Sequence, residues 1–297
     1  MIDDFIKQLE RQGKVIKTQK AYRNSWTRFT EWLAKENPHP TPLGGLPDPQ
    51  MATQLDVANF KRYAVRHYKP NTVNLTMTHL NVIFRWLMQK GVIPDNPVEH
   101  IDRVPTPQSS PKWLTGAEQN SLVRTVRKYG NVREMAMVML MMQAGLRVQE
   151  LCDLRLKDIT ISERKGKAVV YNGKHGKYRE VPLNVDIRRC LTKYLESRSK
   201  ESEYLFDSQR NDKVCVRAVQ SQMERYRKLT GIDHLTCHSL RHTFGHELAL
   251  RKTPLDVIAR LMGHMKNDGT PNLAMTVRYT LPSEEDLARA VEELSWT

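Results

Sequence analysis

A stretch rich in proline and serine divides the chain into two unequal parts. Residues 104–111 read Val-Pro-Thr-Pro-Gln-Ser-Ser-Pro, with three prolines and almost nothing apolar. That composition is typical of an extended, semi-stiff linker. The chain has 297 residues, which is more than one small hydrophobic core needs. We therefore expect one domain over residues 1–104, a linker over 105–111 and a second domain over 112–297.

The first part has the apolar periodicity of helices. Apolar side chains recur at helical spacing in four segments, which predicts four helices; these segments are 5–9, 22–33, 57–64 and 73–87. Asn71 after Pro70 and Gly91 after Lys90 mark the expected ends of the last helix. This part contains neither a carboxylate pair nor a Cys/His cluster, so its sequence offers no obvious catalytic residues.

The charge balance points to a polyanionic partner. The chain has 47 Lys and Arg residues against 33 Asp and Glu, a formal net charge of +14, and both parts are net positive. Such an excess favours nucleic acid over a small cationic ligand. We expect the helical first part to contact a DNA phosphate backbone.

The second part mixes helices with short strands. Thr115 and Glu118 form a capping-box pattern for a helix that runs towards Lys128. A methionine-rich helix over 132–144 is expected to end at Gly145 and to pack in the core rather than to hold a cofactor. β-Branched runs separated by glycine turns predict a small antiparallel sheet of three strands, over 159–161, 168–171 and 178–183.

Helices are expected to resume after the sheet. The expected segments are 240–251, 254–262 and 284–294, the second of them capped by Thr253 and opened by Pro254. The last one has an acidic first turn after Ser283 and an apolar stripe formed by Leu287, Val291 and Leu294. The fold class is therefore mainly α with a small antiparallel sheet.

Several side chains in the second part can do chemistry, although each has an ordinary interpretation alone. Arg147 follows the Gly145 cap and needs an anion, which Glu150 or Asp153 can supply. Lys174 lies at the tip of the expected hairpin, where most lysines are only solvated.

Three further candidates lie nearer the carboxyl end. His238 and Arg241 share one helical face at i and i+3, where they can bind a phosphate and move a proton. His264 follows Gly263 at a helix terminus, and Tyr279 lies in a short segment before Pro282.

The order of these pieces resembles the tyrosine recombinase (phage integrase) superfamily. The pieces are Ala-Gly-Leu-Arg over 144–147, Gly-Lys over 173–174, His-Ser-Leu-Arg-His over 238–242, Gly-His over 263–264, and Tyr279. The resemblance extends from Trp113 to the end of the chain. The helical part before it resembles the core-binding (SAM-like) domain of the same family, so the second part would be the mixed α/β catalytic domain.

The resemblance implies a covalent reaction on DNA. Tyr279 would attack a phosphodiester to give a 3′-phosphotyrosine and a free 5′-hydroxyl. Lys174 would protonate the leaving 5′-oxygen, and His238 would assist proton transfer at the tyrosine. The implied activity is site-specific cleavage and rejoining of duplex DNA, for integration, excision or resolution of mobile or circular DNA.

The same resemblance implies a phosphate clamp. Arg147 and Arg241 would hold the non-bridging oxygens, and His264 would donate a further hydrogen bond. Elementary chemistry agrees with these residue types, because the phosphate gains negative charge as five-coordination develops and fixed cations stabilise that state. A phenol with a pKa of about 10 needs cationic neighbours or a proton acceptor before it attacks well.

We expect no metal and no other cofactor. The built-in positive charge replaces a metal ion, and the covalent intermediate preserves the energy of the broken bond, so ATP is not required. The sequence contains no GxxxxGK[ST] phosphate-binding loop.

Two features leave the arrangement open. The spacing from His264 to Tyr279 is longer than compact family members show, and residues 267–272 look like an inserted loop. The C-terminal helix either folds back on its own domain or docks on a neighbouring protomer. In the second case four chains would hold two DNA partners as a tetrameric synaptic complex.

Three other functions compete with this interpretation. Cys237, His238, His242 and His246 could suggest zinc, but eight residues of helix rise about 12 Å, too far for all three histidines to share one ion. A DNA-binding protein without activity would explain the charge but not the motif series. A type IB topoisomerase would share the phosphotyrosine chemistry but need no partner site.

The remaining features indicate a cytoplasmic, DNA-associated protein. No run of about 18 apolar residues exists for a membrane span. The chain opens with acidic residues where a signal peptide needs basic ones. The four cysteines form no CxxC pair, which favours reduced thiols.

Overall fold

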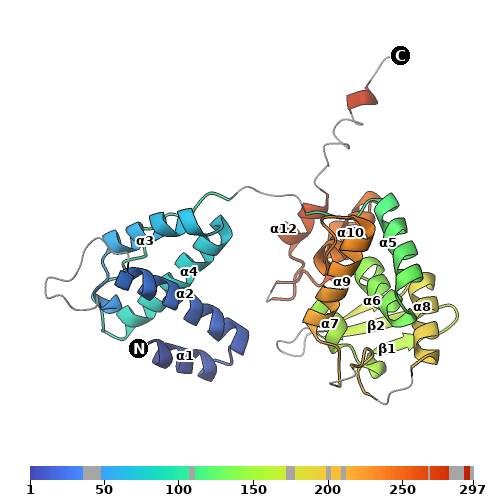
Figure 1. Cartoon of the computed structure of the whole chain (residues 1–297), viewed down its shortest axis with the longest axis horizontal. Helices are drawn as coiled ribbons and strands as arrows, with labels where there is room; N and C mark the ends of the chain where they lie inside the picture. Colours follow the sequence, from blue (N-terminus) through green and yellow to red (C-terminus); the bar gives the residue numbers. More distant parts are fainter. Residues whose placement is uncertain are drawn as a thin grey trace. The chain divides into compact units, whose positions relative to one another are not determined.

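The computed structural model describes most of the chain: residues 1–35, 48–106, 111–171, 178–198, 202–208, 212–266, 268–280 and 291–294. The chain separates into two units, Met1–Gln108 and Ser109–Thr297 (Figure 1). Residues 107–110 of the expected linker lie outside the described part.

The first unit is helical, as its apolar periodicity predicts. Its helices are α1 (Ile2–Arg11), α2 (Ile16–Lys35), the 3-10 turn η1 (Pro49–Met51), α3 (Gln54–His67) and α4 (Pro70–Gln89). Aromatic rings join three of these helices, because Phe29 of α2 contacts Phe60 of α3 and Phe84 of α4 edge-on, with ring centroids 5.3 and 5.9 Å apart. All three rings are fully buried, so they form the centre of this unit's core.

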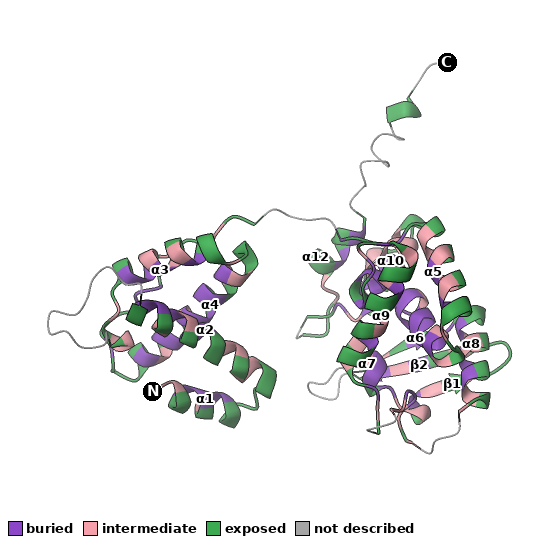
Figure 2. Ribbon diagram, viewed as in Figure 1, coloured by how far each residue is buried: buried purple, intermediate pink, exposed green. Residues whose placement is uncertain are grey.

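The second unit combines helices with a small sheet, which confirms the predicted fold class. Its elements are α5 (Gly116–Tyr129), α6 (Val132–Gln143), α7 (Val148–Asp153), η2 (Leu156–Asp158), β1 (Ile159–Ile161), β2 (Gly166–Tyr171), β3 (Tyr178–Pro182), α8 (Val185–Glu196), α9 (Val216–Thr230), α10 (Cys237–Leu250), α11 (Leu255–Met262), α12 (Leu273–Thr276) and η3 (Val277–Tyr279). Helix α6 packs against both α8 and α10. Figure 2 shows the buried residues concentrated along α6 and the neighbouring inner faces.

The three strands form an antiparallel sheet in the order β1-β2-β3. Ala168 of β2 pairs with Ile159 of β1 and with Val181 of β3. At the far end of the hairpin Tyr171 pairs with Tyr178. The turn that joins these two tyrosines, with Lys174 at its expected tip, lies outside the described residues.

The methionine-rich helix α6 belongs to the core, as expected. Met137, Met139, Met141 and Met142 are all buried. These side chains belong to one buried cluster with residues of α8 and α10, the two helices that α6 contacts. Gly145, just beyond this helix, has the left-handed conformation predicted for a cap (φ +63°).

Helix starts differ from the sequence-based expectation at two places. Helix α10 begins at Cys237 instead of Leu240, because the Thr236 hydroxyl accepts the backbone N–H of Ser239 and so caps the helix earlier. The predicted Thr253 cap is wrong. Pro254 itself is the N-cap residue of α11, and no side chain caps that helix.

The predicted C-terminal helix falls mainly on residues 281–290, which lie outside the described part. In the four described residues that follow, Val291 and Leu294 are exposed. Across the described ranges, no helix is both long enough and apolar enough to cross a membrane.

Candidate active site

Helix α10 brings three candidate side chains to one place. Because Thr236 starts the helix, His238 and Arg241 fall in its first two turns and His242 lies one turn after His238. The His238 and His242 rings meet edge to face with centroids 4.3 Å apart. Helices α10 and α11 pack together, and η3 packs on α10.

Arg241 is almost completely buried, with 2% of its surface exposed. Its guanidinium donates to two backbone carbonyls, those of Gly145 and Met262, and approaches Nε2 of His264 at 3.2 Å. Burial, together with the charge of Arg147, lowers the pKa of Arg241 to about 9. The group still carries its charge at neutral pH, in a fixed position.

Arg147 is held by one carboxylate and remains partly accessible. Its Nη1 lies 2.8 Å from Oε1 of Glu150, while 36% of the Arg147 side chain is exposed. Of the two anions considered from the sequence, Glu150 is therefore the partner. Asp153 instead pairs with Lys213.

Glu150 also binds a second arginine, which the sequence did not reveal. Arg179 of β3 donates to both Glu150 oxygens at 2.9 and 2.8 Å, and its Nε donates to the Leu261 carbonyl. Burial alone would raise the pKa of Glu150, but the hydrogen bonds and charge of Arg179, with those of Arg147, lower it to about 2. This pair ties β3 and α11 to the start of α7.

The cluster has a net positive charge. Three guanidinium groups, those of Arg147, Arg179 and Arg241, surround the single carboxylate of Glu150. Two positive charges therefore remain uncompensated, and a phosphate group is a fitting anion for them.

His264 lies inside the site and not on its surface. It follows Gly263, whose left-handed conformation (φ +64°) ends α11 as expected. A guanidinium can only donate, so Nε2 of His264 accepts from Arg241 and Nδ1 donates to the Thr276 hydroxyl at 3.2 Å. The donor role that the resemblance implies for His264 requires the other tautomer. Burial and the charge of Arg241 lower the pKa of His264 to about 3, so the ring is neutral.

Tyr279 is buried in the same site of the same chain. Its ring stacks on His264 with centroids 6.0 Å apart and planes within 10°, and its hydroxyl lies 3.1 Å from Nδ1 of His242. Burial raises the pKa of Tyr279, while the charges of Arg241, Arg278 and Arg147 act in the opposite direction. Burial lowers the pKa of His238, and the His238 ring contacts the ring of His242.

A glycine of α10 makes room for the tyrosine ring. A Cβ atom on Gly245 would lie 2.9 Å from Cδ1 of Tyr279 and 2.8 Å from Sδ of Met262. The close approach of η3 to α10 therefore depends on the missing side chain.

The unusual spacing before Tyr279 is absorbed by a loop that closes on itself. Met265 and Pro271 form an antiparallel bridge, and the N–H of Asn272 donates to the His264 carbonyl at 2.7 Å. The chain thus returns to His264 before α12 begins. Residue 267 of this expected insertion lies outside the described part.

The structure places five of the six expected site residues in one unit: Arg147, His238, Arg241, His264 and Tyr279. Lys174, the sixth, falls on residues that are not described. The chain matches the phage integrase family over residues 112–285, and an N-terminal SAM-like domain of phage integrases over residues 1–93.

The chain belongs to the tyrosine recombinases of the phage integrase family. It is 31% identical to tyrosine recombinase XerA of Thermococcus kodakarensis, an alignment that covers 99% of this chain and 94% of that protein. It is 28% identical to tyrosine recombinase XerC of Thermodesulfovibrio yellowstonii over 89% of this chain and 87% of the relative. The family comprises enzymes that transfer DNA strands in site-specific recombination.

Solved tyrosine recombinases share the fold. The chain superposes on XerH site-specific recombinase bound to palindromic difH substrate, with a TM-score of 0.77, 18% identity and coverage of 97% of this chain and 84% of that one. A lambda integrase fragment bound to a core site gives a TM-score of 0.74 at 20% identity, covering 94% of this chain and 93% of the fragment. At these identities the likeness supports the architecture alone.

The zinc alternative has no geometric support in the part of the recombinase that the structure describes. There, no three His, Cys, Asp or Glu side chains are arranged to hold a metal ion. His246, one of the three candidate histidines, stacks on Trp113 with ring centroids 3.8 Å apart.

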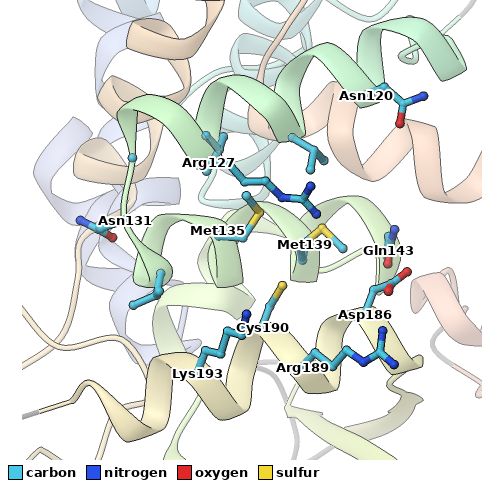
Figure 3. Close-up of a pocket in the computed structure, with 14 residues that line it drawn as sticks. Asn120, Arg127, Asn131, Met135, Met139, Gln143, Asp186, Arg189, Cys190 and Lys193 are labelled. Carbon is cyan, nitrogen blue, oxygen red and sulfur yellow. The ribbon is translucent and has the colours of Figure 1, made fainter.

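A pocket of 580 Å³ opens elsewhere in the catalytic unit, between α5, α6 and α8 (Figure 3). Arg127, Arg189 and Lys193 surround a floor that includes Met135 and Met139. None of the site side chains described above lines this pocket, so the pocket is separate from the candidate active site.

Proposed function

We propose that this chain is a site-specific DNA recombinase that cleaves and rejoins duplex DNA through a 3′-phosphotyrosine at Tyr279. The observation that carries the proposal is the position of the Tyr279 hydroxyl. It is hydrogen-bonded to His242, and its ring lies against His264, which in turn contacts Arg241. A phenol surrounded by guanidinium and imidazole groups suits attack on a phosphodiester.

Arg147 and Arg241 would both bind the phosphate, but in different ways. Arg241 is buried and fixed by two carbonyls, so its charge is already in place when the transition state forms. Arg147 is partly exposed and can turn towards an incoming phosphate. Loss of one such donor typically costs about 2.7–4 kcal/mol in transition-state stabilisation.

The remaining roles follow the family resemblance. Lys174 would protonate the 5′-oxygen as it leaves, and His264 would add a hydrogen bond to the phosphate. His238 would support proton transfer through the adjoining His242 ring. The reaction would need neither a metal ion nor ATP, because the site's own cations neutralise the phosphate and the phosphotyrosine preserves the bond energy.

The partner would be double-stranded DNA, with the basic helical unit and the catalytic unit both contacting phosphates. Four chains would assemble on two DNA partners in the synaptic complex. The XerH and lambda integrase structures, which contain DNA, support the choice of partner by analogy.

The proposal is tested by trapping the covalent intermediate. The purified chain is incubated with a library of nicked duplexes, in which the short fragment that carries the free 5′-hydroxyl diffuses away after cleavage, and denaturation-resistant complexes are isolated. We expect one recurring DNA sequence, joined to the protein at its 3′ end. Recovery of no adduct, or of adducts at unrelated sequences only, would contradict site-specific recombination.

The two rival functions give different results in the same preparation. A type IB topoisomerase would relax supercoiled plasmid as a monomer without a recombination site. A DNA-binding protein without activity would retain the duplexes but form no adduct at all.

A further inference from the structure

The hydrogen-bond partner of the Tyr279 hydroxyl is His242. The distance from Oη to Nδ1 of His242 is 3.1 Å, and the ring centroids are 5.5 Å apart. His238, the residue to which the family resemblance assigns proton transfer, lies one helical turn earlier and contacts the His242 ring. The group next to the attacking oxygen is therefore His242.

His242 is in the right protonation state to accept a proton. Burial, followed by the charges of His238, Arg278 and Arg241, lowers its pKa to about 4. A neutral imidazole has one donor and one acceptor nitrogen. With the ring hydrogen on Nε2, the lone pair of Nδ1 faces the phenol.

Tyr279 needs such an acceptor. Burial raises the pKa of the phenol even though Arg241, Arg278 and Arg147 favour its ionised form. The hydroxyl therefore keeps its proton at neutral pH, and a nucleophilic phenolate forms only if a neighbouring group removes that proton during attack.

The groups around His242 favour proton transfer from Tyr279 to its ring only when a DNA phosphate is bound. From α10 the neighbouring titratable groups are His238 and Arg241, and from the Tyr279 segment they are Tyr279 and Arg278. His264, which precedes that segment, also interacts with His242. These groups are cationic or neutral, so they oppose a charged imidazole in the free protein. A bound phosphate would supply the missing negative charge.

We propose that His242 is the catalytic base that takes the Tyr279 proton as the phenol attacks the DNA phosphate. The inference rests on the proposed function. The bond between Oη and phosphorus forms while the proton moves from Oη to Nδ1 of His242. The bond between phosphorus and the 5′-oxygen breaks, and the 5′-oxygen takes a proton from a separate acid, the role proposed for Lys174. In rejoining, the 5′-hydroxyl returns its proton to the deprotonated acid as it displaces the tyrosine from phosphorus, and the His242 imidazolium returns its proton to Oη.

Two substitutions separate proton transfer from positioning. His242→Asn puts a carbonyl oxygen near the position of Nδ1, so it can accept the hydrogen bond but cannot carry the proton. His242→Ala removes both functions. His246→Asn, one turn further along α10 and stacked on Trp113, is the matched control.

The measurement is the rate of covalent adduct formation in a single turnover, from pH 6 to 9, on a nicked site that the wild-type protein cleaves. We expect a flat profile for the wild type and for His246→Asn, because His242 is already neutral across this range. Both His242 variants should be slower at pH 7 by about 10²–10⁴-fold, the usual contribution of a general base. Their rates should rise about tenfold per pH unit, since hydroxide must then take the proton.

Replacing Tyr279 by a fluorinated tyrosine of lower pKa gives a second test. A phenol of lower pKa loses its proton more easily and depends less on a base. The fluorinated residue should therefore restore most of the rate that His242→Asn loses. A rate defect that persists with the fluorinated residue would overturn the assignment. DNA affinity and melting temperature are measured for each variant, and His242→Asn serves alone if His242→Ala does not fold.

Other results would also overturn the assignment. His242→Asn with the wild-type rate and a flat profile would show that His242 only positions the phenol. A pH-independent loss in both variants would also exclude proton transfer. Failure of the wild-type protein to form any adduct would contradict the proposed function itself. That outcome is distinct from failure of the His242 assignment, in which the wild-type protein still forms the adduct.

Discussion

At the scale of single residues, the site is organised by Glu150. This one carboxylate binds Arg147 and Arg179 directly and lies 3.8 Å from Arg241. Only 8% of its side chain is exposed. A buried carboxylate without its partners is costly, and so are two arginines without their carboxylate.

Glu150→Gln is therefore expected to destabilise the protein. The pKa of Glu150 is about 2 in the folded chain against an ordinary value of 4.5. The charge then contributes about 3 kcal/mol to the free energy of unfolding. Because the pKa of Glu150 is lower in the folded chain than in the unfolded one, this contribution is complete above pH 4.5 and is lost as the pH falls towards 2.

Urea unfolding at pH 7 and pH 3.5 measures the difference in the free energy of unfolding between wild type and Glu150→Gln. We expect this difference to be smaller at the lower pH. A difference independent of pH would contradict the assignment.

Arg147→Ala should separate catalysis from binding. Its guanidinium is partly exposed, yet it is only one of the 47 Lys and Arg residues of the chain. We expect the cleavage rate to fall by about 10²–10³-fold, as for a lost oxyanion donor, with DNA affinity changed by only a few-fold. An equal loss in rate and affinity would make Arg147 a binding residue.

At the scale of elements, the site depends on how closely η3 approaches α10. Gly245 in the middle of α10 permits this contact, since a Cβ atom there would lie 2.9 Å from the Tyr279 ring and 2.8 Å from Met262. Alanine is otherwise the better helix former by about 1 kcal/mol.

Gly245→Ala is expected to reduce adduct formation at least tenfold, because the added methyl group displaces the Tyr279 ring from His242. The melting temperature should change little, since helix propensity offsets part of the steric cost. Gly116→Ala in the first turn of α5 is the control, because a Cβ atom there meets nothing within 4 Å. Equal activities for the two variants would show that the tyrosine tolerates the displacement.

Sequence patterns predict the elements better than the contacts between them. The Thr115–Glu118 capping box and the β-branched runs are local signals, and the corresponding helix and strands are present. Arg179 could not be recognised in the sequence, because its partner Glu150 is 29 residues away and depends on the sheet packing against α7 and α11. The sequence places His242 in the 238–242 motif and among the zinc candidates, but gives it no role beside Tyr279. Its contact with Tyr279 depends on a loop that closes over residues 265–271, a feature that has no local signature.

At the scale of the whole molecule, positive charge is spread over both units. Neither unit is neutral, and the net charge is +14. Affinity for DNA should therefore come mostly from phosphate contacts that release counterions.

DNA binding is expected to weaken steeply with salt. If the two units together contact 6–10 phosphates, affinity should fall by about 10³–10⁵-fold between 50 and 200 mM salt. Equilibrium binding of a duplex site at four or more salt concentrations gives the slope directly. A nearly flat response would contradict DNA binding through the basic surfaces of both units.

The most direct test of the central claim identifies the residue that carries the DNA. The trapped adduct is digested with nuclease and protease, and the modified peptide is sequenced by mass spectrometry. The account predicts a nucleotide 3′-phosphate on Tyr279, and no adduct from Tyr279→Phe at unchanged DNA affinity. Attachment to any other residue, or an adduct that persists in Tyr279→Phe, would contradict it.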